Sequence, residues 1–366
     1  MALELTNDQL VFSFPSVHAE AKLAIEFQRT LRIPDDDKTY PLPPGLGRFP
    51  TKHVHDYKSR VPAHWKEHGG VFVPLYQSEA LWINFHPHHA QDHRHAYPFI
   101  VKVGTGKKSA LTGKDWRKGI HKGDYCVLPE QPWLDGYVIE EGVIAQFVAV
   151  PLGMGITVEE QLGGDGIGGI QLEVFPMKAE AFERRWPKQE RPRVGMRGMR
   201  RRSKDYGADV TKGVSAMNFE CCVGAASADS RGLEDSDLSE MGIGAGGRMK
   251  QQVFEDPYGK EDWSRKVDGT RRCFVHLANS LAWESITGEK PPETPASAAA
   301  YERHGLPWFD YYSDSLQAKK GAKLFKGVKT VKDAAKDKGV TGILPENESV
   351  KPKNVKNVKQ VHNGSW

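Results

Sequence analysis

The chain has 366 residues, of which 39% are hydrophobic and 27% charged, and its formal net charge at pH 7 is +4. This length and composition suffice for a large hydrophobic core without disulfide bonds, and they exclude an intrinsically disordered chain. There is no run of about 18 apolar residues, so neither a membrane-spanning helix nor a membrane partner is expected. The first residues show no secretory signal, which predicts a cytoplasmic protein with reduced cysteines.

Short β-strands dominate the structure predicted for the first half of the chain. A helix is expected over 16–29 and another over 179–185. Segments rich in β-branched and aromatic residues predict strands at 70–76, 80–85, 97–103, 124–128, 142–150 and 169–175. No twelve-residue helical pattern separates them, which favours antiparallel sheets over βαβ units. The fold class is therefore α+β and β-rich, with antiparallel sheets forming a sandwich or an open barrel and a few short helices.

A Gly- and Arg-rich stretch over 191–204 is the best internal boundary. Residues 191–215 are predicted to be a basic loop between a β-rich region, 1–190, and an α+β region, 216–318, that packs on the first; a single α+β body of about 318 residues is the alternative. The second region predicts strands at 217–223, 248–254 and 272–277, and a helix over 296–304 with Thr294 as its N-cap. Cys126 and Cys273 lie in strand-like runs, and we expect both to be buried.

The C-terminal extension, 319–366, is rich in lysine. It contains twelve Lys and four acidic residues, and 329–338 predicts a short surface helix. Such a segment is either a solvated tail or an arm that binds a nucleic acid or another polyanion. Aromatic residues do not alternate with its lysines, which favours the solvated tail.

Polar and aromatic residues gather around the turn after the strand at 124–128. Glu130 and Asp135 supply carboxylates, and Gln131 and Trp133 supply an amide and an indole. This combination suits a polar, hydroxyl-bearing ligand, with one carboxylate as a general base. In the alternative interpretation, the same residues cap the turn and line its rim.

Three further residues are candidates for the same pocket. Arg248 ends the glycine run within an acidic and Gly-rich segment, 232–251, which is either an ordinary exposed loop or an active-site lid; the guanidinium would hold an anion. His276 lies between apolar residues and is either a core histidine or an acid/base group. Trp308, in an aromatic-rich stretch, either anchors the core or forms a stacking wall for a sugar or base.

Five histidines fall within 86–95, between two predicted strands. His86, His88, His93 and His95 have the spacing to share strand faces, and imidazoles are good ligands for zinc, copper or nickel. The segment also fits a hairpin loop that binds metal only adventitiously. The sequence requires no cofactor, and a divalent metal at these histidines is the one candidate.

Four segments together resemble an uncharacterised family of bacterial and fungal proteins, some of which carry an integral-membrane label. They are 29–37, 40–50, 129–136 and 305–312. The resemblance spans most of 25–350 and implies a common fold, but it brings no activity.

Three functions follow from these residues. The first is a protein that binds a polar small molecule in a β-rich pocket, with Glu130, Asp135 and His276 as acid/base groups if it is an enzyme. The second is a non-enzymatic binding or scaffold protein that holds an anionic partner through 191–204 and 319–359. The third is metal-dependent chemistry at the histidines of 86–95.

Overall fold

Two β-sheets packed face to face form the body of the protein. The computed structural model describes residues 3–90, 93, 95–188, 240–265, 271–294, 296–311, 313, 315–340 and 348–357. Strands make up 38% and helices 17% of the structure. In the described ranges both sheets are open and neither closes into a barrel. The predicted β-rich α+β class is confirmed.

The first sheet has ten strands and includes the antiparallel pairs β1–β2 and β2–β3 of the N-terminal region. Its main order is β1-β2-β3-β8-β16-β18-β4, with β5, β14 and β15 paired at its sides. The strands are β1 (Leu3–Thr6), β2 (Gln9–Ser13), β3 (Lys22–Thr30), β4 (Thr39–Tyr40), β5 (Gly45–Arg48), β8 (Ala80–Pro87), β14 (Trp133–Leu134), β15 (Gly136–Glu140), β16 (Val143–Pro151) and β18 (Met241–Lys250).

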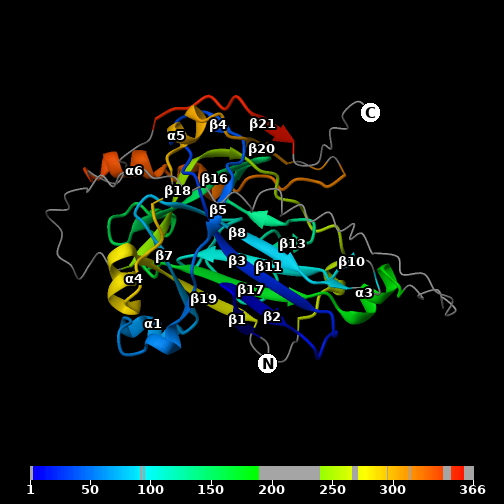
Figure 1. Ribbon diagram of the computed structural model, residues 1–366. Coiled ribbons are helices and arrows are strands. Elements are labelled where there is room, and N and C mark those ends of the chain that lie inside the picture. The colour runs from blue at the N-terminus through cyan, green and yellow to red at the C-terminus, as the bar shows by residue number, and fades with distance from the viewer. Residues whose placement is uncertain are drawn as a thin grey trace, which may run out of the picture.

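The second sheet has seven strands and lies behind the first in the view of Figure 1. Its order is β12-β11-β17-β19-β7-β6, with β13 paired to β11. The strands are β6 (Lys52–His53), β7 (Val71–Leu75), β11 (Phe99–Thr105), β12 (Lys108–Ser109), β13 (Cys126–Leu128), β17 (Ile170–Pro176) and β19 (Arg272–Asn279). Two small ribbons complete the strands: β9 (His89–Ala90) with β10 (His95–Ala96), and β20 (Trp308–Asp310) with β21 (Val355–Asn357).

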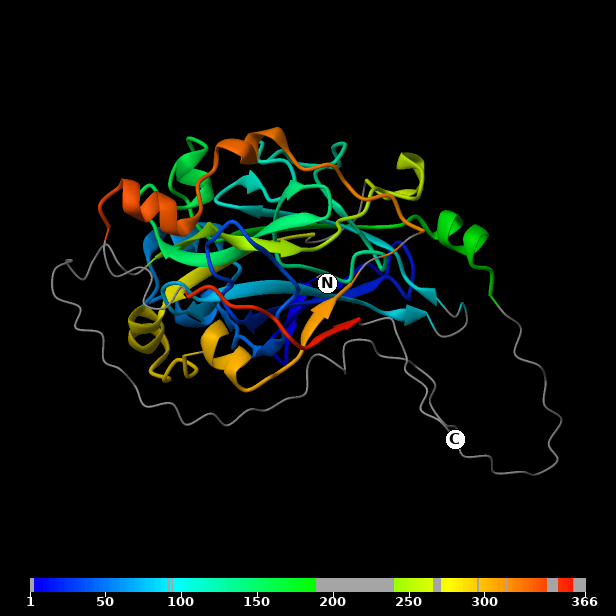
Figure 2. The same ribbon diagram turned by 90° about the horizontal axis from the view of Figure 1, so that it is seen from above.

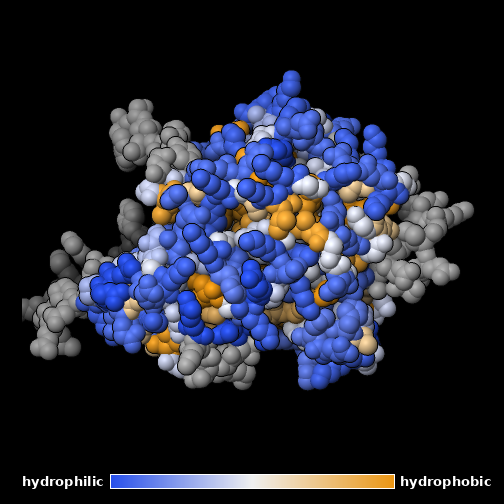
Figure 3. All heavy atoms as spheres, turned by 180° about the vertical axis from the view of Figure 1, so that it is seen from behind, coloured by the Kyte–Doolittle hydropathy of each residue, from blue (hydrophilic) through white to orange (hydrophobic). Residues whose placement is uncertain are grey.

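Short helices lie around the sheets (Figures 1 and 2). They are α1 (Ala63–His68), α2 (Val158–Gln161), α3 (Ala179–Arg185), α4 (Ser280–Thr287), α5 (Ala298–Arg303) and α6 (Val331–Asp337), with single 3₁₀ turns η1 (Val54–Tyr57), η3 (Lys260–Asp262) and η4 (Lys323–Gly327). None of the helices in the described ranges is long and apolar enough to cross a bilayer. Seen from behind, the surface is mostly hydrophilic, with hydrophobic residues near its centre and in several smaller groups elsewhere on this face (Figure 3).

Side chains from both sheets meet in one hydrophobic core. Ile25 and Phe27 of β3 pack in the same cluster as Val101 of β11 and Val174 of β17, and all four are at most 1% exposed. The free thiols of Cys126 and Cys273 are buried, as predicted. Burial of this apolar surface is the main force that holds the two sheets together.

The expected helix over 16–29 is wrong, because that part of the chain contains β3. Leu23, Ile25 and Phe27 face the core while Glu26 and Gln28 face the other side of the sheet. This alternation has the period of a strand, and hydrogen bonds to β2 and β8 use the backbone groups that a helix would satisfy internally.

The glycine-rich end of 232–251 is not a loop or lid, because 241–250 form β18, which lies between β16 and β4 in the first sheet. A Cβ atom on Gly247 would lie 2.3 Å from the carbonyl oxygen of Pro34, and one on Gly244 would lie 2.6 Å from Val331 of α6. The glycines therefore serve the close approach of neighbouring segments. The predicted strand 248–254 overlaps only the end of β18.

Strands of the predicted regions 1–190 and 216–318 pair with each other in both sheets. β18 pairs with β16 and β4 in the first sheet, and β19 pairs with β17 and β7 in the second. Three strand pairs, β4·β18, β7·β19 and β20·β21, are parallel. The basic loop 191–215 and the predicted strand 217–223 lie outside the described residues, so the boundary there stays a prediction.

The described part of the Lys-rich extension packs on the body. The predicted helix over 329–338 is present as α6, and its Val331 joins Val148 and Val150 of β16 in a small hydrophobic cluster. The helix predicted over 296–304 is α5, but its N-cap is Ser297, whose hydroxyl accepts a hydrogen bond from the Ala300 amide.

Candidate functional site

The outer face of the first sheet carries buried polar and aromatic side chains. In the antiparallel register, Glu26 of β3 lies opposite Asn84 of β8, and Asn84 lies opposite Trp133 of β14. Residues directly opposite one another share a sheet face, and so do residues two apart along a strand. We call the set formed by Glu26, Gln28, Trp82, Asn84, His86 and Trp133 the polar–aromatic face. It lies on the β3–β8 region nearest the viewer in Figure 1.

Glu26 is the anionic centre of this face. Its carboxylate accepts hydrogen bonds from the side chains of Gln9 (2.6 Å), Gln28 (2.8 Å) and Asn84 (3.1 Å), and it pairs with His86 (3.0 Å) and Arg48 (3.3 Å). Burial acts to raise the pKa of Glu26, but the hydrogen bonds from His86, Gln9 and Gln28 outweigh it and lower the pKa to about 2. The group is therefore a fixed negative charge.

Three aromatic rings adjoin the polar side chains. Trp133 is central, with its ring centroid 6.0 Å from that of Trp82 and 4.8 Å from that of Tyr311. Trp82 is 9% exposed, whereas Trp133 and Tyr311 are half-buried. Rings of this kind offer flat apolar surfaces with a polar edge.

The segment that passes from β13 in the second sheet to β14 in the first holds four of the predicted residues. Gln131 donates a hydrogen bond to the Trp133 carbonyl oxygen and accepts one from the Phe254 amide. Asp135 accepts a hydrogen bond from Gln251, and its own amide donates to the same side chain. Burial raises the pKa of Asp135 to about 7, against the opposing effect of hydrogen bonds from Gln251 and Trp133. The glutamines thus fix this segment in place.

Glu130 lies at the margin of the face. Its Oε1 accepts a hydrogen bond from the Tyr258 hydroxyl, and its charge acts on the pKa of Tyr311. Burial raises the pKa of Glu130, while the Tyr258 hydrogen bond acts to lower it. A carboxyl group whose pKa is raised is more readily protonated than an exposed one, which suits an acid/base group.

Apart from His86 Nε2, which pairs with Glu26, three buried polar atoms of this region have no hydrogen-bond partner in the part of the chain that the structure describes. They are the indole nitrogen of Trp82, the amide oxygen of Asn84 and Oε2 of Glu130. Buried polar atoms are almost always hydrogen-bonded in native proteins, so such a group calls for a water molecule or a ligand. Two acceptors and one donor near three rings suit a molecule with several hydroxyl groups.

The other predicted pocket residues lie elsewhere. Arg248 pairs with the Glu140 carboxylate at 2.9 Å, beside the β15–β16 hairpin. His276, on the second sheet, is fully buried, stacks on Trp65 and contacts the Gly69 carbonyl oxygen at 3.1 Å. Burial lowers the pKa of His276 to about 3. The described contacts do not join it to Glu130 or Asp135.

Trp308 has the surroundings of a core anchor. It is fully buried, its ring lies 5.9 Å from that of Tyr301 and 6.4 Å from that of Tyr40, and its indole nitrogen donates to Glu302. It has no open ring face for a sugar or base.

The histidines of 86–95 bind different partners. His86 pairs with Glu26, His88 with Glu20, His93 contacts the Trp186 carbonyl oxygen, and His95 stacks on the Trp186 ring at 3.9 Å. Within the described ranges, no group of three or more His, Cys, Asp or Glu side chains is arranged to hold a metal ion. His93 and His95 thus contact Trp186 at the end of α3, whereas His86 and His88 face glutamates of β3 and of the turn before it.

Sequence reasoning missed Glu26, Trp82 and Asn84. The signal was the alternation of apolar and polar residues over 22–28, which marks a strand with one polar face. The alternation in 80–86 carries the same information for Trp82 and Asn84. The cross-strand register, which brings the two segments together, is a tertiary property.

Comparison of the chain with protein-family models, with curated proteins and with solved structures gave no match. The resemblance to an uncharacterised family therefore stays a prediction.

Proposed function

We propose that the polar–aromatic face, together with Glu130, binds a small molecule that carries several hydroxyl groups, such as a sugar or another polyol. The observation that carries this proposal is the set of unpartnered polar atoms on Trp82, Asn84 and Glu130 beside the ring of Trp133. A hydroxyl group both donates and accepts hydrogen bonds, so one ligand can satisfy a donor and two acceptors.

Each side chain has a distinct role in this proposal. The rings of Trp133 and Tyr311, which are half-buried, pack against the C–H surface of the ligand. The Trp82 indole donates a hydrogen bond, and the Asn84 amide oxygen accepts one. Asn84 is held in place because its amide nitrogen already donates to Glu26. The fixed charge of Glu26 thus orients the binding group without contacting the ligand.

Glu130 is the acid/base group that we assign to this site. Its Oε2 is free for the ligand among the described residues, while Tyr258 holds Oε1. If the bound molecule is also a substrate, Glu130 is the group that donates a proton to it or accepts one from it. We further infer a cytoplasmic location, which the free thiols of Cys126 and Cys273 support, because unpaired buried thiols suit a reducing compartment.

The test is saturation-transfer NMR and tryptophan fluorescence with a panel of mono- and disaccharides and linear polyols. Trp82→Phe keeps one aromatic ring but removes the unpartnered N–H together with the five-membered ring that carries it, so a bound member of the panel should bind about tenfold more weakly. Trp133→Ala should abolish binding because it removes the central ring.

Trp116→Phe is the matched control. Trp116 is half-buried beside Lys102 of the second sheet and should leave binding unchanged. The proposal fails if no member of the panel binds, or if Trp82→Phe and Trp116→Phe change the affinity equally.

A further inference from the structure

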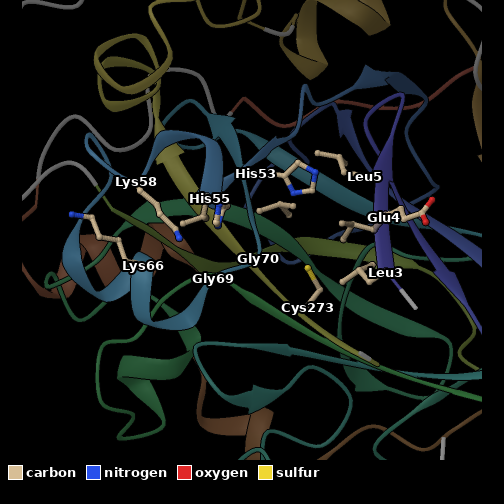
Figure 4. A pocket seen from close by; sticks show the side chains of 13 residues that line it. Leu3, Glu4, Leu5, His53, His55, Lys58, Lys66, Gly69, Gly70 and Cys273 are labelled. Atoms are coloured by element: carbon tan, nitrogen blue, oxygen red, sulfur yellow. The ribbon is translucent and has the colours of Figure 1, made fainter. Parts of the chain in front are cut away.

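A pocket, separate from the polar–aromatic face, opens between the edges of the two sheets. Its volume is about 350 Å³. One wall comes from the β1–β2 hairpin at the edge of the first sheet, and the other from β6, β7 and β19 of the second sheet (Figure 4). Because the sheets do not close on each other, this gap leads from the surface to the hydrophobic core.

The inner part of this pocket is apolar. Leu10 and Val71 are each 2% exposed and belong to the main core, and Leu3 and Leu5 pack on that core from β1. Gly70 is held in a left-handed conformation with a φ of +82°, and a Cβ atom there would lie 2.1 Å from the Phe274 carbonyl oxygen. No side chain can therefore grow from this position into the gap.

The outer part of the pocket is cationic. Lys58, Lys66, His53 and His55 line it, and none of their side chains has an ion pair or a hydrogen bond with the described residues. The neighbouring Lys52, in contrast, pairs with Glu289 at 2.7 Å. The pocket thus combines two lysine ammonium groups with an apolar floor.

The one carboxylate of the lining does not neutralise these cations. Glu4 alternates with Leu3 and Leu5 along β1; it is exposed while its two neighbours are partly buried. Figure 4 shows its carboxylate on the outer side of the strand, away from Lys58 and Lys66. An anion at the mouth would therefore meet uncompensated positive charge.

We infer that this pocket binds an amphipathic anion, a carboxylate with an unbranched alkyl chain of medium length. The chain enters between the sheets against Leu3, Leu5 and Leu10, and the carboxylate stays at the mouth beside Lys58 and Lys66. The volume is near the lower end of the range of about 300–1,000 Å³ for small-molecule pockets, which favours a medium over a long chain.

The inference is tested by calorimetric titration of the full chain with hexanoate, octanoate and octanol. Each added methylene should tighten binding about fourfold, because each buries a further CH₂ group. Octanoate should bind at least fivefold more tightly than octanol because only the carboxylate meets the lysines.

Two variants locate the site. Lys58→Gln with Lys66→Gln should weaken octanoate binding about five- to tenfold without changing octanol binding, whereas Lys114→Gln with Lys118→Gln, at exposed lysines of another loop, should change neither. Leu5→Trp should block the gap and abolish binding of both ligands, with its thermal unfolding measured as a check on the fold.

Absence of octanoate binding to the unaltered chain overturns the inference. Equal affinity for octanoate and octanol also overturns it, as does unchanged octanoate affinity in the lysine double variant or in a folded Leu5→Trp variant. Because sugars do not enter these titrations, the outcome is independent of the function proposed for the polar–aromatic face.

Discussion

Glu26 and Asp135 are two buried carboxylates on neighbouring parts of the same sheet, and their environments shift their pKa values in opposite directions. Glu26 and Asp135 are each 4% exposed, yet burial outweighs the hydrogen bonds at Asp135, whereas the hydrogen bonds outweigh burial at Glu26. Glu26 adjoins the imidazole of His86, the guanidinium of Arg48 and three amide donors, and its pKa falls to about 2. Asp135 has only the uncharged donors of Gln251 and Trp133, and its pKa rises to about 7.

The difference shows that a buried carboxylate stays ionised where its partners outweigh the effect of burial on its pKa, and not where burial dominates. Glu26 is a permanent anion that orders its surroundings. Asp135 is near its titration point at neutral pH and contributes a group whose charge depends on pH. Glu130, with one donor and one free oxygen, is the carboxylate of this region that has capacity left for a ligand.

Removal of the Glu26 side chain should have the largest effect on stability. Glu26→Ala leaves His86, Arg48 and three amide groups without their common acceptor, and we expect a loss of about 3–5 kcal/mol in the free energy of unfolding. Urea denaturation at pH 7 measures it. Glu4→Ala, at an exposed carboxylate of β1, is the control and should change stability by less than about 0.5 kcal/mol. Similar losses in both variants would contradict the role of Glu26.

The contribution of Glu26 to stability should decrease at acidic pH. Its pKa is lower in the folded chain than the ordinary value of 4.5, so its stabilising contribution is complete above that value and is lost as the pH falls towards 2.

Asp135 should act in the opposite direction. Its folded-state pKa is raised from 3.8 to about 7. Below pH 4 the carboxyl group is protonated in both the folded and the unfolded chain, so it costs no stability there, and stability is lost as the pH rises from 4 to 7. The loss amounts to at most about 4 kcal/mol. Asp135→Asn removes this titration, and the stability difference between pH 4 and pH 8 should shrink accordingly. Denaturation curves at both pH values check it; an unchanged difference would show that Asp135 does not titrate in this range.

Glu130→Gln should have the smallest effect on stability. The Tyr258 hydroxyl can still donate to the amide oxygen, and Oε2 has no partner to lose among the described residues, so a change below about 1 kcal/mol is expected. Binding of a ligand found in the sugar panel should weaken about tenfold in the same variant. A large stability loss with unchanged binding would make Glu130 a structural residue.

The strands at 80–85 and 142–150 could be predicted because their apolar and β-branched residues have no helical period. The reading of side-chain periodicity failed at 16–29, where a helix was predicted in place of a strand with a polar outer face. It failed at 241–250 because a glycine-rich sequence has no apolar periodicity. Of the candidate site, the turn with Glu130, Gln131, Trp133 and Asp135 was found from its composition alone. Arg248, His276 and Trp308 were assigned to it because local sequence gives no distance between segments.

The sequence by itself determined the β-rich class, the burial of Cys126 and Cys273 and the residue types around 130–135, because these depend on local composition and on the period of side chains along a strand. Only the tertiary structure placed Glu26 and Asn84 beside Trp133, since that neighbourhood depends on the register of three strands from distant parts of the chain. The same holds for the pocket between the sheet edges, which exists because the edges of β1 and β6 stay apart at that end of the sandwich.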